Sequence, residues 1–203
     1  MTERDSKAHP STFRSPEAWS GGHYELAILL GEHDDDRASS AAMRLWSHPL
    51  IDGPYASKRE LSETQHRVDP VQVLERGLYG TADLTPGIRV PCGSVLTRFD
   101  DGSDWIQLYL PMGSISAWFR TDGFPFDSDD QRQRWEDDLD SWLIEVAKHV
   151  FAGTRFELAL VGFEVDIVRF SKAKMREFVL PEHRQEGILL PLNEQLQWFP
   201  PSS

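Results

Sequence analysis

Three apolar stretches in the middle of the chain are separated by two tight-turn signals, and this pattern restricts the fold more than any other feature of the sequence. The first turn, at residues 85–87, is Thr-Pro-Gly, and the second, at residues 100–102, is Asp-Asp-Gly. Turns of this composition between apolar stretches are typical of antiparallel hairpins. The sequence therefore predicts a three-stranded meander with strands at Leu78–Leu84, Ile88–Phe99 and Asp104–Leu110.

Two other segments carry the spacing of amphipathic helices. In the later one, apolar residues recur at three- and four-residue intervals from Trp135 onward, which predicts a helix over Asp129–Val150. In the earlier one, three consecutive aspartates at positions 34–36 precede apolar residues that share one face, which predicts a capped helix over Asp36–Trp46. Each helix therefore has one apolar side to bury.

Two short apolar runs supply further strands. Tyr24–Leu30 and Phe156–Val165 have the length of buried strands and are too short for typical helices. The resulting element order is strand, helix, three strands, helix, strand. This order predicts an α+β fold in which two helices pack on one face of a mainly antiparallel sheet.

Composition divides the chain into three parts. Residues 1–21 are polar and are expected to form a flexible leader. Residues 22–165 hold the predicted elements and are expected to form a single α+β domain, in which residues 47–76 form a long loop. Residues 166–203 are expected to be a C-terminal extension that packs on or projects from the domain, with Gly187–Leu192 as a candidate strand.

The charge of the chain restricts its partners. The net charge is −12, with 33 acidic and 21 basic residues. Such a surface repels nucleic-acid phosphates and favours basic proteins or cations, so direct nucleic-acid binding is not expected. A single cysteine excludes an internal disulfide and suits a reducing compartment. The absence of a long apolar run argues against membrane insertion, and we expect a cytoplasmic location.

The acidic surplus is densest between Asp122 and Asp140, where eight carboxylates accompany two arginines. Carboxylates at this density repel one another, and a basic partner would relieve that repulsion. Aromatic residues come directly before this acidic run. Aromatics rimmed by charge are typical of interface cores, although the same rings would also suit the gap between meander and helix. The residues predicted to bind a partner are Trp118, Phe119, Phe124, Phe126, Asp127, Asp129, Asp130, Asp137 and Asp138.

Two isolated features offer catalytic chemistry. Cys92 is a potential nucleophile, but its neighbours indicate a strand, in which Pro91 and Gly93 suggest a bulge or an edge. A lone cysteine in a strand is usually a small buried hydrophobe. His33, Asp34 and Asp36 carry metal-ligating atoms but lack the spacing of a known metal motif, and helix capping explains the aspartates equally well. No nucleotide-binding motif or nucleophile elbow is present. We therefore predict no metal, cofactor or catalytic residue.

In general character the chain resembles the immunity proteins that inhibit secreted bacterial toxins. The resemblance rests on composition: a small, acidic α+β chain in which a dense acidic run follows a group of aromatic residues. It implies an acidic protein-binding module that inhibits a basic protein partner. The alternative is a small cytosolic enzyme, a hydrolase or a metal-dependent activity, that uses Cys92 or the cluster of His33, Asp34 and Asp36.

Overall fold

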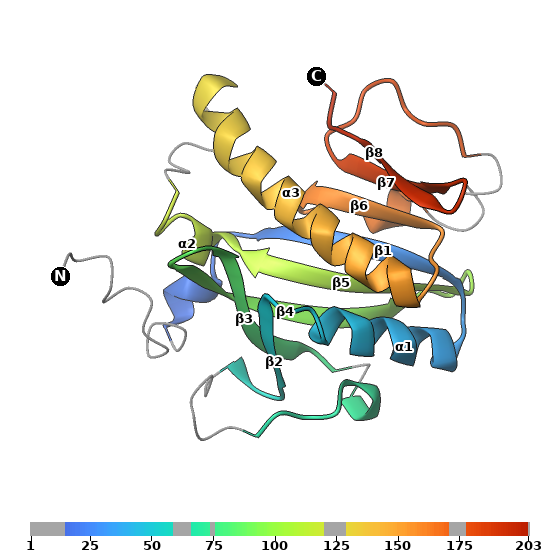
Figure 1. The fold of residues 1–203 in the computed structure, drawn as a ribbon, viewed down its shortest axis with the longest axis horizontal. Coiled ribbons are helices and arrows are strands. Elements are labelled where there is room, and N and C mark those ends of the chain that lie inside the picture. The colour runs from blue at the N-terminus through green and yellow to red at the C-terminus, as the bar shows by residue number, and fades with distance from the viewer. Residues whose placement is uncertain (1–14, 59–65, 74–75, 120–128, 171–177, 203) are drawn as a thin grey trace.

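A computed structural model describes residues 15–58, 66–73, 76–119, 129–170 and 178–202, with the side chains of α3 described from Trp135 onward. One antiparallel sheet of eight strands dominates this part of the chain, in the order β2-β3-β4-β5-β1-β6-β7-β8 (Figure 1). The strands are β1 (His23–Glu32), β2 (Ile51–Tyr55), β3 (Leu78–Thr85), β4 (Ile88–Arg98), β5 (Ser103–Pro111), β6 (Leu158–Phe163), β7 (Gly187–Leu192) and β8 (Gln195–Phe199). The helices are α1 (Asp35–Trp46), α2 (Met112–Ile115) and α3 (Asp129–Gly153), with short 3₁₀ turns η2 (Pro16–Trp19), η4 (Pro70–Val73) and η5 (Ile167–Phe170). The predicted α+β class is confirmed.

The meander of β3, β4 and β5 forms as its turn signals predict. Gly87 and Gly102 have φ values of 87° and 85°, which glycine adopts without the steric cost that a side chain would add. Consecutive strands then pair with their neighbours, and Leu96 of β4 lies opposite Ile106 of β5. Residues two positions apart along each strand share a face, so the register decides which side chains gather on each side of the sheet.

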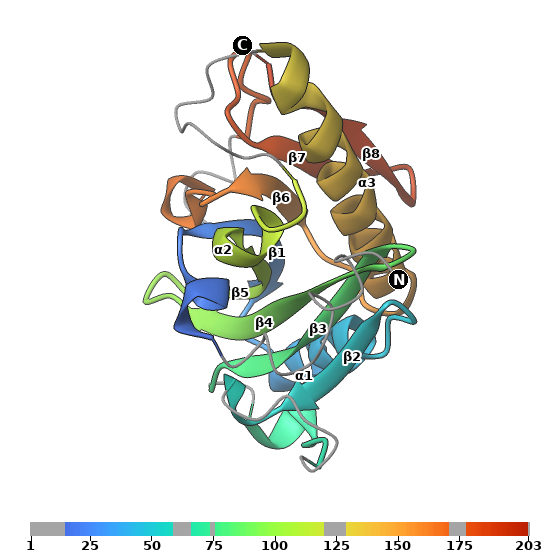
Figure 2. The same cartoon turned by 90° about the vertical axis from the view of Figure 1, so that its left-hand side faces the viewer.

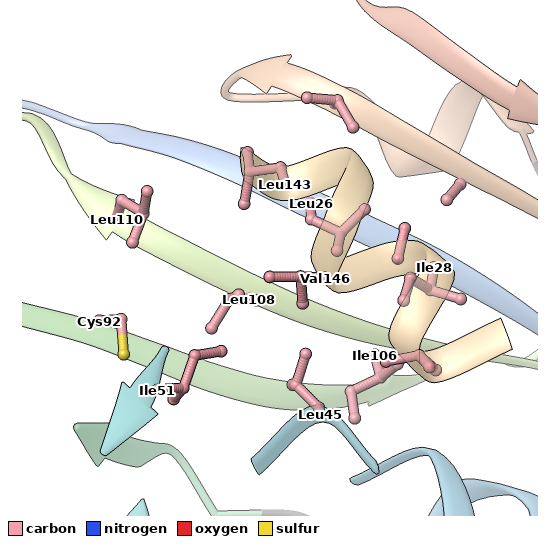
Figure 3. Packing of buried hydrophobic residues seen from close by; sticks show 14 of the residues in the cluster. Leu26, Ile28, Leu45, Ile51, Cys92, Ile106, Leu108, Leu110, Leu143 and Val146 are labelled. Atoms are coloured by element: carbon pink, nitrogen blue, oxygen red, sulfur yellow. The ribbon is translucent and has the colours of Figure 1, made fainter. Parts of the chain in front are cut away.

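Helices α1 and α3 cover one face of the sheet and build the main core. Figure 3 shows Leu143 and Val146 of α3 beside Leu26 and Leu108 of the sheet, all of them buried. Leu45 brings α1 into the same core. The Asp34 side chain caps α1, since its Oδ1 accepts the Arg37 N–H at 3.0 Å. The two predicted helices therefore lie where their apolar spacing indicated.

The other face of the sheet holds a second, smaller core. Leu29, Trp105 and Leu160 are buried there and pack with Phe170, which follows β6. Figure 2 shows that the sheet is strongly twisted and that η5 lies on the side away from α3. Apolar burial on both faces explains why β1 and β6 are nearly continuous apolar runs.

The sheet is larger than the sequence indicated. Ile51–Tyr55 form the edge strand β2, so the prediction of a loop over 47–76 is wrong for these residues. Gly53 and Pro54 obscure this strand in the sequence, because both residue types are depleted in strands and proline is confined mainly to edges. At the other end β7 pairs with β6, and β8 is a further strand that was not predicted.

The described residues that precede β1 pack against α2. Residues 15–21 include η2, and the Ser114 hydroxyl of α2 donates to the Ala18 carbonyl at 2.6 Å. Residues 1–14 lie outside the described part of the chain. Within the described residues, no helix has the length and apolar character needed to cross a membrane.

Candidate functional site: an acidic helix face

The acidic run falls on α3, the longest described helix. Asp137 and Asp138 are exposed on its outer side, and Glu136 beside them is half-buried. Asp129 and Asp130 lie in its first turn, where the side chains are not described. Neither Asp137 nor Asp138 forms an ion pair with a described residue. The described part of the face is therefore a carboxylate surface that a cation from outside the chain could neutralise.

One carboxylate of the run points inward instead. Asp140 is buried over β1, where the Tyr24 hydroxyl donates to its Oδ1 at 2.6 Å. The Trp135 ring packs edge-on against Tyr24 with their centres 5.7 Å apart. Burial raises the pKa of Asp140 to about 6, and the nearby Glu136 and Asp137 add to the rise. The ionised form of Asp140, beneath the exposed acids of α3, is therefore destabilised by burial and by neighbouring negative charge.

The aromatic residues before the run are only partly described. Trp118 and Phe119 follow α2, are half-buried and pack against the main core. These contacts fit the alternative in which the rings fill the gap between the meander and the helix. Phe124, Phe126 and Asp127 lie outside the described residues. The structure therefore shows side chains for Trp118, Phe119, Asp137 and Asp138 among the predicted partner-binding residues.

Cys92 is placed where a nucleophile could not work. Its side chain is fully buried in the main core on β4, near Ile51 (Figure 3). Burial raises the pKa of the Cys92 thiol far above its ordinary value, with Asp52 as a smaller cause. A reactive cysteine needs the opposite environment, with partial exposure and nearby positive charge.

The cluster of His33, Asp34 and Asp36 does not converge on one point. Asp34 caps α1, and Asp36 is exposed in the first turn of that helix. His33 instead points to the buried Asp104 of β5, with 3.4 Å between His33 Nε2 and Asp104 Oδ1. Across the described residues, no three His, Cys, Asp or Glu side chains are placed to hold a metal ion.

A second group of side chains, which the sequence did not indicate, gathers on the sheet face away from α3. We call Trp19, His23, Tyr79 and Tyr109 the sheet-face cluster. Trp19 and Tyr79 pack edge-on with ring centres 5.6 Å apart, and His23 packs on Tyr109 at 4.7 Å. All four are half-buried. They come from η2, β1, β3 and β5, so no spacing in the sequence could have revealed them.

Strand register explains how this cluster assembles. Tyr79, Gly93, Tyr109 and Glu25 lie directly opposite one another in a row across β3, β4, β5 and β1. The Tyr109 ring lies over Gly93, where a Cβ atom would collide with it. At the end of the row Glu25 is buried, and its carboxylate accepts the Val165 N–H at 3.0 Å and the Gln107 amide at 3.2 Å. Burial raises the pKa of Glu25 to about 7.

No protein-family model, curated protein or solved structure matches this chain. The functional argument therefore depends on the geometry and electrostatics of the described residues.

Proposed function

We propose that this protein is an acidic protein-binding module of the cytoplasm, similar in role to an immunity protein, that inhibits a basic protein partner. The observation that carries the proposal is the outer face of α3, where Asp137 and Asp138 are exposed without a described basic partner. Asp129 and Asp130 extend the same acidic segment toward the start of the helix.

The electrostatics of this face favour a basic partner over no partner. Like charges four positions apart on one helix, such as those of Glu136 and Asp140, destabilise it by a few tenths of a kcal/mol per pair. A cationic surface would remove this repulsion and would also steer the encounter of the two proteins. The net charge of −12 extends this preference for a cationic partner beyond α3. Such a surface disfavours nucleic acid as a direct ligand.

The enzyme alternative has less physical support. The Cys92 thiol is fully buried, and its raised pKa opposes formation of the thiolate. Asp34 caps α1, His33 points to Asp104, and Asp36 is exposed. The three side chains therefore share no common ligand position within the described residues. We therefore favour the binding module.

A capture experiment with matched baits tests the proposal. The wild-type chain, the variant Asp137→Lys with Asp138→Lys, and the control Asp166→Lys with Glu182→Lys are immobilised and exposed to extract of the source cell. Both variants change the net charge equally, but the control places its exposed substitutions on the C-terminal segment. We expect a basic protein to be retained by the wild type and the control and lost from the α3 variant. Equal retention by all three baits would refute the proposal.

A further inference from the structure

The sheet-face cluster already holds a positive charge. The Lys58 ammonium lies 5.4 Å from the centre of the Trp19 ring, in the position of a cation–π contact. Lys58 is exposed and stands after β2, whereas Trp19 belongs to η2. Two segments that are distant in sequence therefore meet at this ring.

The surroundings of this contact suit a cation. Tyr79 packs edge-on against Trp19, and the exposed Lys58 reaches the same indole ring. The exposed Glu164 stands next to the cluster, because its N–H donates to the His23 carbonyl at 2.9 Å and its carboxylate lies over Gly22. The exposed Glu17 precedes Trp19 by two residues. Aromatic faces and carboxylates are the groups that proteins use to bind arginine and lysine side chains.

The sheet-face cluster and the acidic face of α3 lie near the same end of β1. His23 and Tyr24 are neighbours at the start of β1 and point to opposite sides of the sheet. Tyr24 contacts Asp140 and Trp135 of α3, whereas His23 contacts Tyr109 of the cluster. The two surfaces thus flank the same end of β1, where α2 and η2 lie (Figures 1 and 2).

We propose that the Trp19–Tyr79 pair binds an arginine or lysine side chain of a basic protein partner, and that Lys58 occupies this position in the free protein. The inference rests on the proposed function and adds a specific contact to it. Arginine is the better fit of the two, since its planar guanidinium stacks on an aromatic ring and can also pair with a carboxylate such as that of Glu164. The partner's side chain would displace Lys58 without any change in the fold.

Titration with N-acetyl-arginine amide, followed by NMR through the backbone amide signals of Tyr79 and Tyr109, which the Trp19→Leu variant retains, tests this inference directly. N-acetyl-citrulline amide is the neutral control of the same shape. Trp19→Leu should weaken arginine binding by about fivefold, the ratio that corresponds to ~1 kcal/mol for an exposed cation–π contact. Lys58→Ala should strengthen binding by roughly threefold, because it removes the competing ammonium.

The control for Lys58→Ala is Lys148→Ala, which removes the same charge from an exposed position on α3. Equal arginine affinity in these two variants, or equal binding of arginine and citrulline, would overturn the inference. Binding measurements with the captured partner distinguish this inference from the proposed function. If the α3 acids control partner capture while Trp19→Leu leaves the dissociation rate unchanged, the proposed function stands and the cation position falls. If arginine amide binds as predicted while the α3 acids have no effect on capture, the cation position stands and the proposed role of the α3 acids falls.

Discussion

At the scale of single residues, Asp140 shows why part of the acidic run has a structural role. In the sequence Asp140 is one acid among several in the run, yet its carboxylate is buried and accepts a hydrogen bond from the Tyr24 hydroxyl. The contact joins residues 116 positions apart, so local sequence patterns could not reveal it. The sequence did indicate correctly that Cys92 lies in a strand, because it stands within the apolar stretch Ile88–Phe99.

The Asp140 carboxyl makes stability depend on pH in a predictable direction. Its pKa of about 6 in the folded protein exceeds the ordinary value of 3.8, so the folded state holds the proton more tightly than the unfolded state. The resulting stabilisation is complete below pH 4 and is lost as the pH rises to 6. Asp140→Asn keeps an acceptor for the Tyr24 hydroxyl and removes this dependence.

We therefore expect Asp140→Asn to gain stability relative to the wild type between pH 4 and pH 7, by up to about 3 kcal/mol. Urea unfolding at both pH values measures the difference. Asp138→Asn is the control, since it removes an exposed carboxylate from the same helix. A stability difference between Asp140→Asn and wild type that is the same at both pH values would show that the buried carboxylate is not the cause.

At the scale of elements, prediction succeeded where the signal was local. The meander and α3 carry their turns and apolar spacing within the segment itself, and both form as expected. Strand β2 was missed because Gly53 and Pro54 oppose the strand pattern. The sheet-face cluster could not be predicted at all, because it depends on the register of β1, β3 and β5 and on the position of Trp19. Register is a property of the whole sheet.

The packing of β8 on β7 gives a test of the C-terminal strands. The Trp198 ring lies against Gly187, so a Cβ atom at Gly187 would collide with it. Gly187→Ala should therefore destabilise the protein by about 1–3 kcal/mol through overpacking. The control is the same substitution in a Trp198→Leu background, where the loss should be much smaller. Thermal unfolding measures both, and equal losses in the two backgrounds would rule out this contact as the cause.

At the scale of the whole molecule, the two proposed binding surfaces lie on opposite sides of the sheet. The acidic face of α3 covers one side, and the sheet-face cluster with its aromatic rings lies on the other. Exposed carboxylates mainly accelerate association, and this effect weakens as salt screens the charges. Desolvated aromatic contacts mainly slow dissociation. The two surfaces are therefore expected to affect different rate constants.

The association rate with the captured partner, measured across a series of salt concentrations, tests the central claim most directly. The protein carrying Asp129→Lys, Asp130→Lys, Asp137→Lys and Asp138→Lys is compared with the wild type, after unfolding measurements show that both are folded. We predict that the variant associates at least about tenfold more slowly at low salt and that its rate depends much less on salt. A variant that associates as fast as the wild type, with the same salt dependence, would contradict the account and reduce the acidic run to a solvated helix surface.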